Sequence, residues 1–264
     1  MIKKIYNFLL SKKSIFRWKK DAKSIRKIIL KGNKKPKRLN LLGRILILAP
    51  HSDDEWIGCF PLIEKYDCSI CCMDMPGGND NKTREVRFSE MLNIAELYSR
   101  SLLMVGSDKV ESLKKIIDEI CPAYIALPFF IDWHDEHFMT MNILRGAISN
   151  YSGKIICYQV SCPIPMNYVT DFIPMSKTDL KRKWHIFKNN YITQKAFPWK
   201  RFMEIEIAEG GYCKSYAANV FFVCDVDDWL KAFGIIPDLN KISKIISMLN
   251  QPKRLFLLVN GIKE

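Results

Sequence analysis

From residue 44 onward, short apolar runs alternate with segments of helical periodicity. The apolar runs are long enough for buried strands and lie at 44–49, 68–75, 101–105, 123–128 and 153–160. Helices are expected between them. The first follows the run at 44–49 and extends to about Tyr66, and the others cover 82–98, 108–120 and 137–149. Strands that alternate with helices imply βαβ units. The pattern therefore predicts an α/β fold with a mainly parallel sheet and helices on both of its faces.

The remaining third of the chain has a weaker pattern. Residues 161–224 are less regular, with a polar helix expected over 177–194 and an apolar run at 220–224. The tail, 225–264, is expected to form one or two helices and a strand-like segment at Arg254–Val259. A chain of 264 residues is long enough for one large domain. We predict a basic arm over 1–39 and a single body domain over 40–264.

The net charge of +13 belongs to the N-terminal arm. Residues 1–44 hold sixteen Lys/Arg and one acid, whereas the rest of the chain holds 25 basic and 27 acidic residues. The arm mixes lysines with apolar residues at loosely helical spacing, which is broken near Gly32 and Pro36. Such a helix can lie on an anionic membrane surface as a peripheral contact, or it can pack its apolar stripe on the body. Both alternatives stay open, and a non-enzymatic binding protein that uses this arm is a further hypothesis.

Composition also limits the partners and the compartment. The body is nearly neutral and has no basic-aromatic RNA signature, so nucleic acid is not expected as a partner. No run of eighteen apolar residues and no secretory signal is present. The nine cysteines are odd in number and lie mostly in apolar runs, which is typical of reduced, buried thiols. We expect a cytoplasmic protein, with the inner membrane face as a more specific location.

Three of the four histidines lie in two short acidic clusters. The first is His51-Ser52-Asp53-Asp54-Glu55, and the second is Asp132-Trp133-His134-Asp135-Glu136-His137. Each cluster follows a predicted strand, and ligand sites in such folds lie beyond the carboxyl ends of the strands. Imidazole and carboxylate groups together are typical of a first-row metal site. The sequence therefore predicts a metal-dependent catalytic site.

The same residues define the reaction that such a site can perform. A catalytic zinc site uses three protein ligands and leaves one position for water, whose pKa falls from ~15.7 towards ~7. A nearby carboxylate can then complete the deprotonation, and a remaining imidazole can stabilise an oxyanion. This set of groups is complete for hydrolysis of an amide or an ester.

The two clusters resemble the signatures of a known family. Ala49-Pro50-His51-Ser52-Asp53-Asp54-Glu55 looks like the His-Pro-Asp-Asp-Glu signature of the PIG-L/LmbE-like N-acetylglucosaminyl deacetylases. The second cluster looks like that family's His-x-Asp-His signature. Three weaker matches follow in order, so that the resemblance spans about residues 44–222: Arg87-Phe-Ser-Glu90, Tyr191-Ile-Thr-Gln194 and Tyr216-Ala-Ala-Asn-Val-Phe221.

The resemblance implies a Rossmann-like fold and a zinc-dependent deacetylase that acts on an N-acetylated amino sugar. We expect the substrate to be an N-acetylhexosamine conjugate, for which a nucleotide- or lipid-linked glycan intermediate is one candidate. Carried over by position, the implied roles are zinc binding by His51, Asp54 and His137, general base catalysis by Asp53, and oxyanion stabilisation by His134 oriented by Glu136. Arg87 would contact the sugar, and Glu55 is also predicted to contact substrate.

Alternatives and departures from the family pattern remain. Fe²⁺ could replace zinc, and a non-sugar amide or ester could be the substrate. The chain departs from the family pattern at Ser52, Glu136 and Asn219, where the family has proline, aspartate and glutamate.

Overall fold

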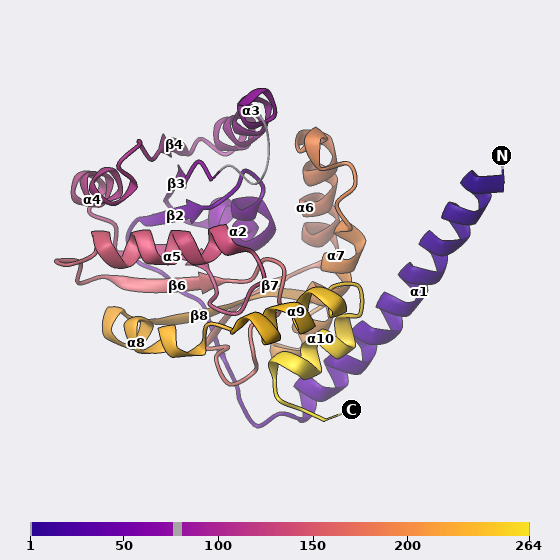
Figure 1. Ribbon diagram of the computed structural model, residues 1–264. Coiled ribbons are helices and arrows are strands. Elements are labelled where there is room, and N and C mark those ends of the chain that lie inside the picture. Colours follow the sequence, from indigo (N-terminus) through magenta and orange to yellow (C-terminus); the bar gives the residue numbers. More distant parts are fainter. Residues whose placement is uncertain (1, 76–80, 264) are drawn as a thin grey trace.

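A computed structural model describes residues 2–75 and 81–263, with side chains over 12–75 and 82–263. Within these residues, eight strands form one sheet in the order β1-β7-β8-β6-β5-β2-β3-β4. The strand bounds are β1 Lys37–Arg38, β2 Ile45–Ala49, β3 Cys68–Cys72, β4 Ser101–Met104, β5 Tyr124–Pro128, β6 Lys154–Tyr158, β7 Asp171–Met175 and β8 Ala217–Asp225. Figure 1 shows the sheet between two layers of helices. The chain therefore has the α/β architecture that the sequence predicts.

Most strand pairs are parallel, as expected. Neighbouring strands in the run β4-β3-β2-β5-β6 pair in parallel, and β1 is parallel to β7. Strand β8 runs antiparallel to both β6 and β7, between which it lies. The central strand β2 is buried on both faces, so its run of five apolar residues shows no polar alternation.

Helices cover both faces of the sheet. The helix bounds are α1 Ile2–Lys31, α2 Asp54–Lys65, α3 Asn81–Leu97, α4 Lys109–Ile120, α5 Asp135–Ala147, α6 Lys177–Asn190, α7 Trp199–Glu209, α8 Val226–Lys231, α9 Leu239–Met248 and α10 Pro252–Val259. Helices α2, α3, α6 and α7 contribute to the core on one face, and α4, α5, α8 and α9 contribute to the core on the other. In β2, Ile45 and Ile47 belong to the first core, whereas Leu46 and Leu48 belong to the second.

The strand order creates a crevice beside β2. The chain runs from β2 outward to β3 and β4, then returns so that β5 pairs with the other edge of β2. Loops that leave the carboxyl ends of β2 and β5 therefore diverge to opposite faces of the sheet. In open α/β sheets, this switch point is where ligands bind. Both histidine clusters follow these two strands.

The C-terminal part of α1 packs on the body. Ala22, Ile25 and Ile29 are buried against Ala208 of α7 and Phe256 of α10. Towards its N-terminus, α1 projects away from the body (Figure 1). The helix ends at Lys31, close to the break that the sequence indicates. No helix among the described residues is long and apolar enough to cross a membrane.

Two predictions about secondary structure were wrong. The strand-like segment Arg254–Val259 lies in helix α10, because Pro252 begins the helix and Leu255, Phe256 and Val259 then share a buried side. Strand β7 lies in a stretch that was expected to be irregular, and it contains Pro174. The helix expected over 177–194 ends at Asn190 and is followed by a 3₁₀ turn, η1 Ile192–Gln194.

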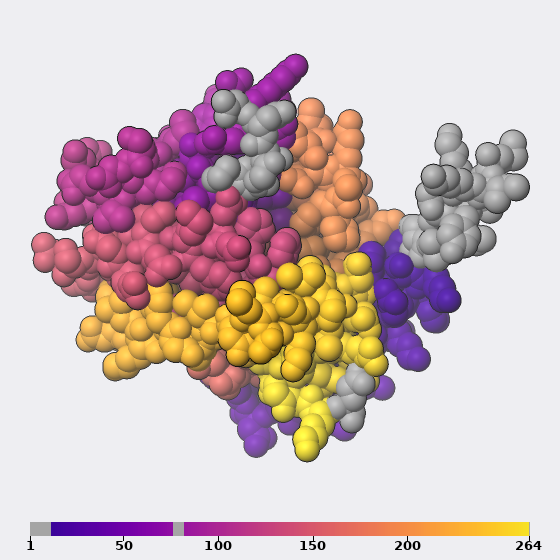
Figure 2. Space-filling model, in the orientation of Figure 1, coloured from indigo at the N-terminus to yellow at the C-terminus, as the bar shows by residue number. Residues whose placement is uncertain are grey.

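Figure 2 shows the C-terminal helices lying beside α1 on one face of the molecule.

All nine cysteines are free, and most of them are buried in strands or under helices. The thiols of Cys59 and Cys157 are fully buried, and burial raises the pKa of each well above its ordinary value. This agrees with the expectation of reduced thiols.

Candidate active site

The two loops at the switch point bring three histidines together. His51 follows β2, His134 precedes α5, and His137 lies in the first turn of α5. The ring centroids are 4.5 Å apart for His51 and His134 and 5.1 Å apart for His134 and His137. One ring nitrogen from each histidine lies within 4.8 Å of the other two. These three residues are therefore a possible metal site at the predicted position.

Asp54 lies beside two of the histidines. Its Oδ2 atom is 3.2 Å from Nδ1 of His51 and 3.4 Å from Nε2 of His137. The same oxygen accepts the backbone N–H of His51 at 3.0 Å. Burial alone would raise the pKa of Asp54, but His137 and His51 outweigh it and lower that pKa. Asp54 is therefore an anionic oxygen donor that adjoins the imidazoles.

Asp132 fixes the orientation of His137. Its Oδ2 atom lies 3.0 Å from Nδ1 of His137, and both side chains are about 2% exposed. This contact leaves Nε2 of His137 facing Asp54. A carboxylate behind a metal-binding histidine is a common supporting interaction. The sequence prediction assigned no role to Asp132, although its place five residues before His137 in the acidic cluster was a usable signal.

Asp53 has an unusual backbone conformation. Its φ of 151° and ψ of −24° lie in a region that L residues rarely adopt, which costs about 1–3 kcal/mol. Its Oδ1 atom is 3.2 Å from Nη2 of Arg87. Burial and the adjacent Asp54 carboxylate raise the pKa of Asp53 to about 7, and Arg87 opposes this rise. A buried carboxyl group with this pKa is suited to accept and return a proton near neutral pH.

Glu55 lies directly behind the backbone of Asp53. It is completely buried: Oε2 accepts the backbone N–H of Asp53 at 3.0 Å, and Oε1 accepts the hydroxyl hydrogen of Tyr191. Both carboxylate oxygens of Glu55 face protein groups, and its contact with substrate stays a prediction. Glu55 ties the strained backbone of Asp53 to Tyr191, which follows α6. Sequence resemblance singled out Tyr191 but gave it no role.

Glu136 lies beside two of the three histidines, His134 as expected and His51 in addition. Its carboxylate is hydrogen-bonded to Nε2 of His51 and lies 3.9 Å from Nδ1 of His134, beyond hydrogen-bond distance. The backbone N–H of Glu136, by contrast, donates to Nδ1 of His134 at 3.4 Å. The peptide group of Glu136 therefore makes the hydrogen bond to the His134 ring, and its carboxylate lies at ion-pair distance from the same ring. Burial and the nearby His51 and His137 lower the pKa of His134.

A small groove opens beside His51. It has a volume of about 30 Å³ and is lined in part by Ser52, Arg84 and Arg87. Ser52 donates its hydroxyl hydrogen to the backbone carbonyl of Arg87, and Nη2 of Arg87 donates to the Ser52 carbonyl at 3.2 Å. Ser52 thus joins the turn after β2 to helix α3. Arg87, which the sequence predicts to contact substrate, lines the groove and also contacts Asp53.

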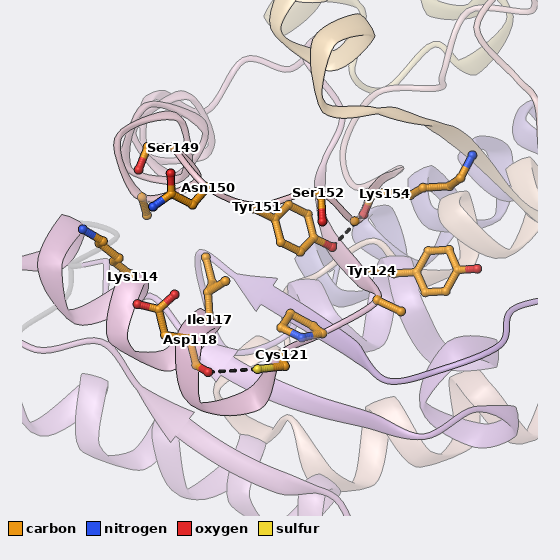
Figure 3. Close-up of a pocket in the computed structure, with 14 residues that line it drawn as sticks. Lys114, Ile117, Asp118, Cys121, Tyr124, Ser149, Asn150, Tyr151, Ser152 and Lys154 are labelled. Atoms are coloured by element: carbon orange, nitrogen blue, oxygen red, sulfur yellow. Dashed lines mark hydrogen bonds between the residues drawn. The ribbon is translucent and has the colours of Figure 1, made fainter.

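A larger hollow lies elsewhere. It has a volume of about 590 Å³ and is bordered by Tyr124 and Lys154, the first residues of β5 and β6 (Figure 3). It therefore lies at the amino ends of the strands, opposite the histidines. Its polar contacts are local, such as the Tyr151 hydroxyl donating to the Lys154 carbonyl at 3.2 Å. None of the three clustered histidines lines it.

A buried ion pair supports the helix that carries Asp54. Nζ of Lys183 donates to the carbonyl of Ile57 in α2 at 2.5 Å and pairs with the Glu206 carboxylate. Lys183 has no exposed surface. The Trp56 indole N–H donates to the Lys183 carbonyl at 3.0 Å, and the Trp184 indole donates to Glu206 at 2.7 Å. Helices α6 and α7 therefore hold α2 in place through polar contacts as well as apolar packing.

Comparison with known proteins places the fold among solved structures. Neither a family model nor a curated protein matches the sequence. The conserved protein TT1542 from Thermus thermophilus matches 68% of this chain and 94% of its own, with a TM-score of 0.55 and 15% identity.

Two deacetylase structures also match. The zinc-inhibited form of teicoplanin deacetylase Orf2 matches 70% of this chain and 99% of its own, with a TM-score of 0.53 and 12% identity. The deacetylase Dbv21, which is named for the A40926 pseudoaglycone, matches 69% and 97%, with a TM-score of 0.51 and 13% identity. Because the sequence identities are low, these matches show that the chain shares the fold of these proteins.

Proposed function

We propose that this protein is a metal-dependent hydrolase that removes the N-acetyl group from an N-acetylated amino sugar, as the PIG-L/LmbE-like deacetylases do. One observation carries the proposal: His51, His134 and His137 converge with Asp53 and Asp54 at the switch point of the sheet. Two proteins that share the fold are described as deacetylases, one of them in a zinc-inhibited form. The motifs after β2 and β5 support the same family.

The side chains at the site fit a divalent first-row metal. We assign His51, Asp54 and His137 as ligands, since the Asp54 carboxylate lies within 3.4 Å of a nitrogen in both rings. Nitrogen and oxygen donors of this kind suit Zn²⁺, and they also suit Fe²⁺. When bound, such a metal supplies Lewis acidity for the amide carbonyl and for a nucleophilic water. His134 is close enough to serve as a further ligand.

Asp53 is our candidate general base. A pKa raised to about 7 allows its carboxylate to take a proton from the attacking water and then to give a proton to the departing amine. Arg87 holds the Asp53 carboxylate from the groove side. Glu55 holds the Asp53 backbone from the buried side. Contacts therefore hold both the carboxylate and the backbone of Asp53, which keeps the candidate base oriented towards the reacting groups.

His134 is our candidate for stabilising the oxyanion. Because Nδ1 of His134 faces the backbone N–H of Glu136, the proton of a neutral ring resides on Nε2. The lowered pKa of His134 favours that neutral form. The Nε2–H group can then donate to the oxygen that becomes negative when the acetyl carbonyl is attacked.

Acetate release across a panel of amides tests this function. The panel contains N-acetylhexosamine conjugates, including nucleotide- and lipid-linked forms, together with non-sugar amides and esters. We expect the zinc-loaded protein to release acetate from the sugar amides and His51→Ala to lose both metal and activity. His185→Ala is the matched control, because His185 is exposed on α6 and lies outside the cluster. Full activity and full metal content in His51→Ala would refute the assignment.

A further inference from the structure

The outer face of α1 carries a row of lysines. In the described part of this helix, seven lysines are exposed and recur at intervals that keep them on one side of an α-helix: Lys12, Lys13, Lys19, Lys20, Lys23, Lys27 and Lys31. Phe16 lies in the same row, one turn after Lys12, and is 74% exposed. The row therefore combines a dense positive charge with an exposed aromatic side chain.

Packing fixes the direction in which this row faces. Ala22, Ile25 and Ile29 lie on the opposite side of α1 and are at most 3% exposed. Nη1 and Nη2 of Arg26 donate to the carbonyls of Ile207 and Ser215 at 2.7 and 2.6 Å, so the helix cannot rotate without breaking these bonds. The lysine row is consequently exposed along the outer side of α1, and its Lys19 and Lys23 also lie near the Glu204 carboxyl group of α7.

Acidic side chains of α1 do not neutralise the row. Asp21 is the only acidic residue in α1. It lies on another side of the helix, where its Oδ2 accepts the backbone N–H of Lys253 at 3.4 Å. The chain after residue 44 is nearly neutral, with 25 basic and 27 acidic residues. The positive potential is thus concentrated on a helix that stands at the margin of the molecule (Figure 2).

We propose that the outer face of α1, from Lys12 to Lys31 with Phe16, docks on the surface of an anionic lipid bilayer. Lysines near such a surface are attracted by the acidic headgroups, and an exposed aromatic ring enters the boundary between headgroups and acyl chains. Phe16 distinguishes this surface from a purely electrostatic one, because an apolar ring gains little from a phosphate backbone. The preceding sequence is also rich in apolar residues, with Ile2, Ile5, Phe8, Leu9 and Leu10.

Sedimentation of the full-length protein with lipid vesicles tests this docking. Vesicles of phosphatidylcholine with phosphatidylglycerol are compared with vesicles of phosphatidylcholine alone, at two salt concentrations. We expect binding to the anionic vesicles that weakens as salt rises. The principal variant replaces four lysines of the row by glutamine: Lys19, Lys20, Lys23 and Lys27. With roughly five-fold lost per lysine near the surface, its partition coefficient should fall on the order of several hundred-fold.

A charge-matched control separates this face from net charge. It replaces four exposed lysines of the body by glutamine: Lys65, Lys115, Lys181 and Lys244. We expect this control to bind vesicles almost as well as the unmodified protein, and Phe16→Ser to lose affinity at unchanged salt dependence. Circular dichroism verifies that each variant is folded.

Two outcomes would overturn the proposal. The first is equal loss of vesicle binding in the row variant and in the body control. The second is tighter binding of α1 to double-stranded DNA or to RNA than to anionic vesicles at the same salt concentration, which would assign the row to nucleic acid. Neither result bears on hydrolysis of a water-soluble amide, so this proposal and the proposed function can fail separately.

Discussion

Replacing Tyr191 by phenylalanine tests whether the second half of the chain controls the candidate base. The Tyr191 hydroxyl donates to Oε1 of Glu55, and Oε2 of Glu55 accepts the backbone N–H of Asp53. The substitution removes one oxygen atom and leaves the ring packing against Phe187 intact. It therefore interrupts the link from Tyr191 to Asp53 without opening a large cavity.

The expected cost follows from the burial of both partners. Tyr191 is 1% exposed and Glu55 has no exposed surface, so water cannot replace the lost donor. An unsatisfied buried acceptor costs about 1–3 kcal/mol, which is similar to the strain that the φ angle of Asp53 stores. We therefore expect Asp53 to relax from its strained conformation. Misplacement of a catalytic group by about 1 Å lowers the rate on the order of 100-fold.

Two measurements on one pair of variants check this reasoning. Tyr158→Phe is the control, because Tyr158 is also fully buried and donates one hydrogen bond, to the Leu48 carbonyl at 2.8 Å. Urea unfolding should show a similar loss of stability in both variants. Acetate release should fall only in Tyr191→Phe, with the stoichiometry of bound zinc unchanged. Equal activity of the two variants would show that the Tyr191–Glu55 contact only stabilises the fold, and the reasoning would be refuted.

Three further predictions concern groups behind the site. Asp132→Ala should lower zinc affinity about 10–100-fold, measured by competition with a chelator, because His137 loses its orienting partner; unchanged affinity would contradict the assignment. Lys183→Met should cost about 3–5 kcal/mol in urea unfolding, since Glu206 is left as an uncompensated buried charge, and a loss under 1 kcal/mol would argue against this. Burial and Glu206 raise the pKa of Glu209 well above its ordinary value. The folded protein therefore binds this proton more tightly than the unfolded chain does. The resulting contribution to the free energy of unfolding is complete below about pH 4 and is lost as pH rises through the folded-state pKa. Glu209→Gln should therefore gain stability relative to the unmodified protein between pH 5 and pH 9, and a constant difference over that range would count against the shift.

The first half of the fold was predictable because its signals are local. Buried parallel strands appear as short apolar runs, and the runs before His51 and before Asp132 are strands β2 and β5. The later segments depend on tertiary contacts. Strand β7 contains Pro174, which sequence rules exclude from central strands, although Pro174 pairs with Ala218 of β8. The apolar run at 254–259 is compatible with either a strand or a helix, and tertiary packing determines that it forms a helix.

The candidate site was predictable in its composition but not in its connections. The scarcity of histidine and its position after two strands identified His51, His134 and His137 together. The placement of Glu55 could not be foreseen, because its partner Tyr191 lies 136 residues away. The position of Asp132, five residues before His137, was a usable signal for a contact, but the sequence does not distinguish its role from that of the neighbouring carboxylates until the direction of each side chain is known.

The candidate site depends on two parts of the chain, because the strained turn at Asp53 is held through Glu55 by Tyr191. The groups assigned to the metal follow β2 and β5, whereas the conformation of the base depends on a tyrosine that follows α6. Local opening of the segment after α6 that carries Tyr191 would thus release the candidate base and leave the proposed metal ligands in place. Metal content would then be a poor measure of the active fraction, and hydrogen exchange at Tyr191 and in the 3₁₀ turn after it would report on that fraction better.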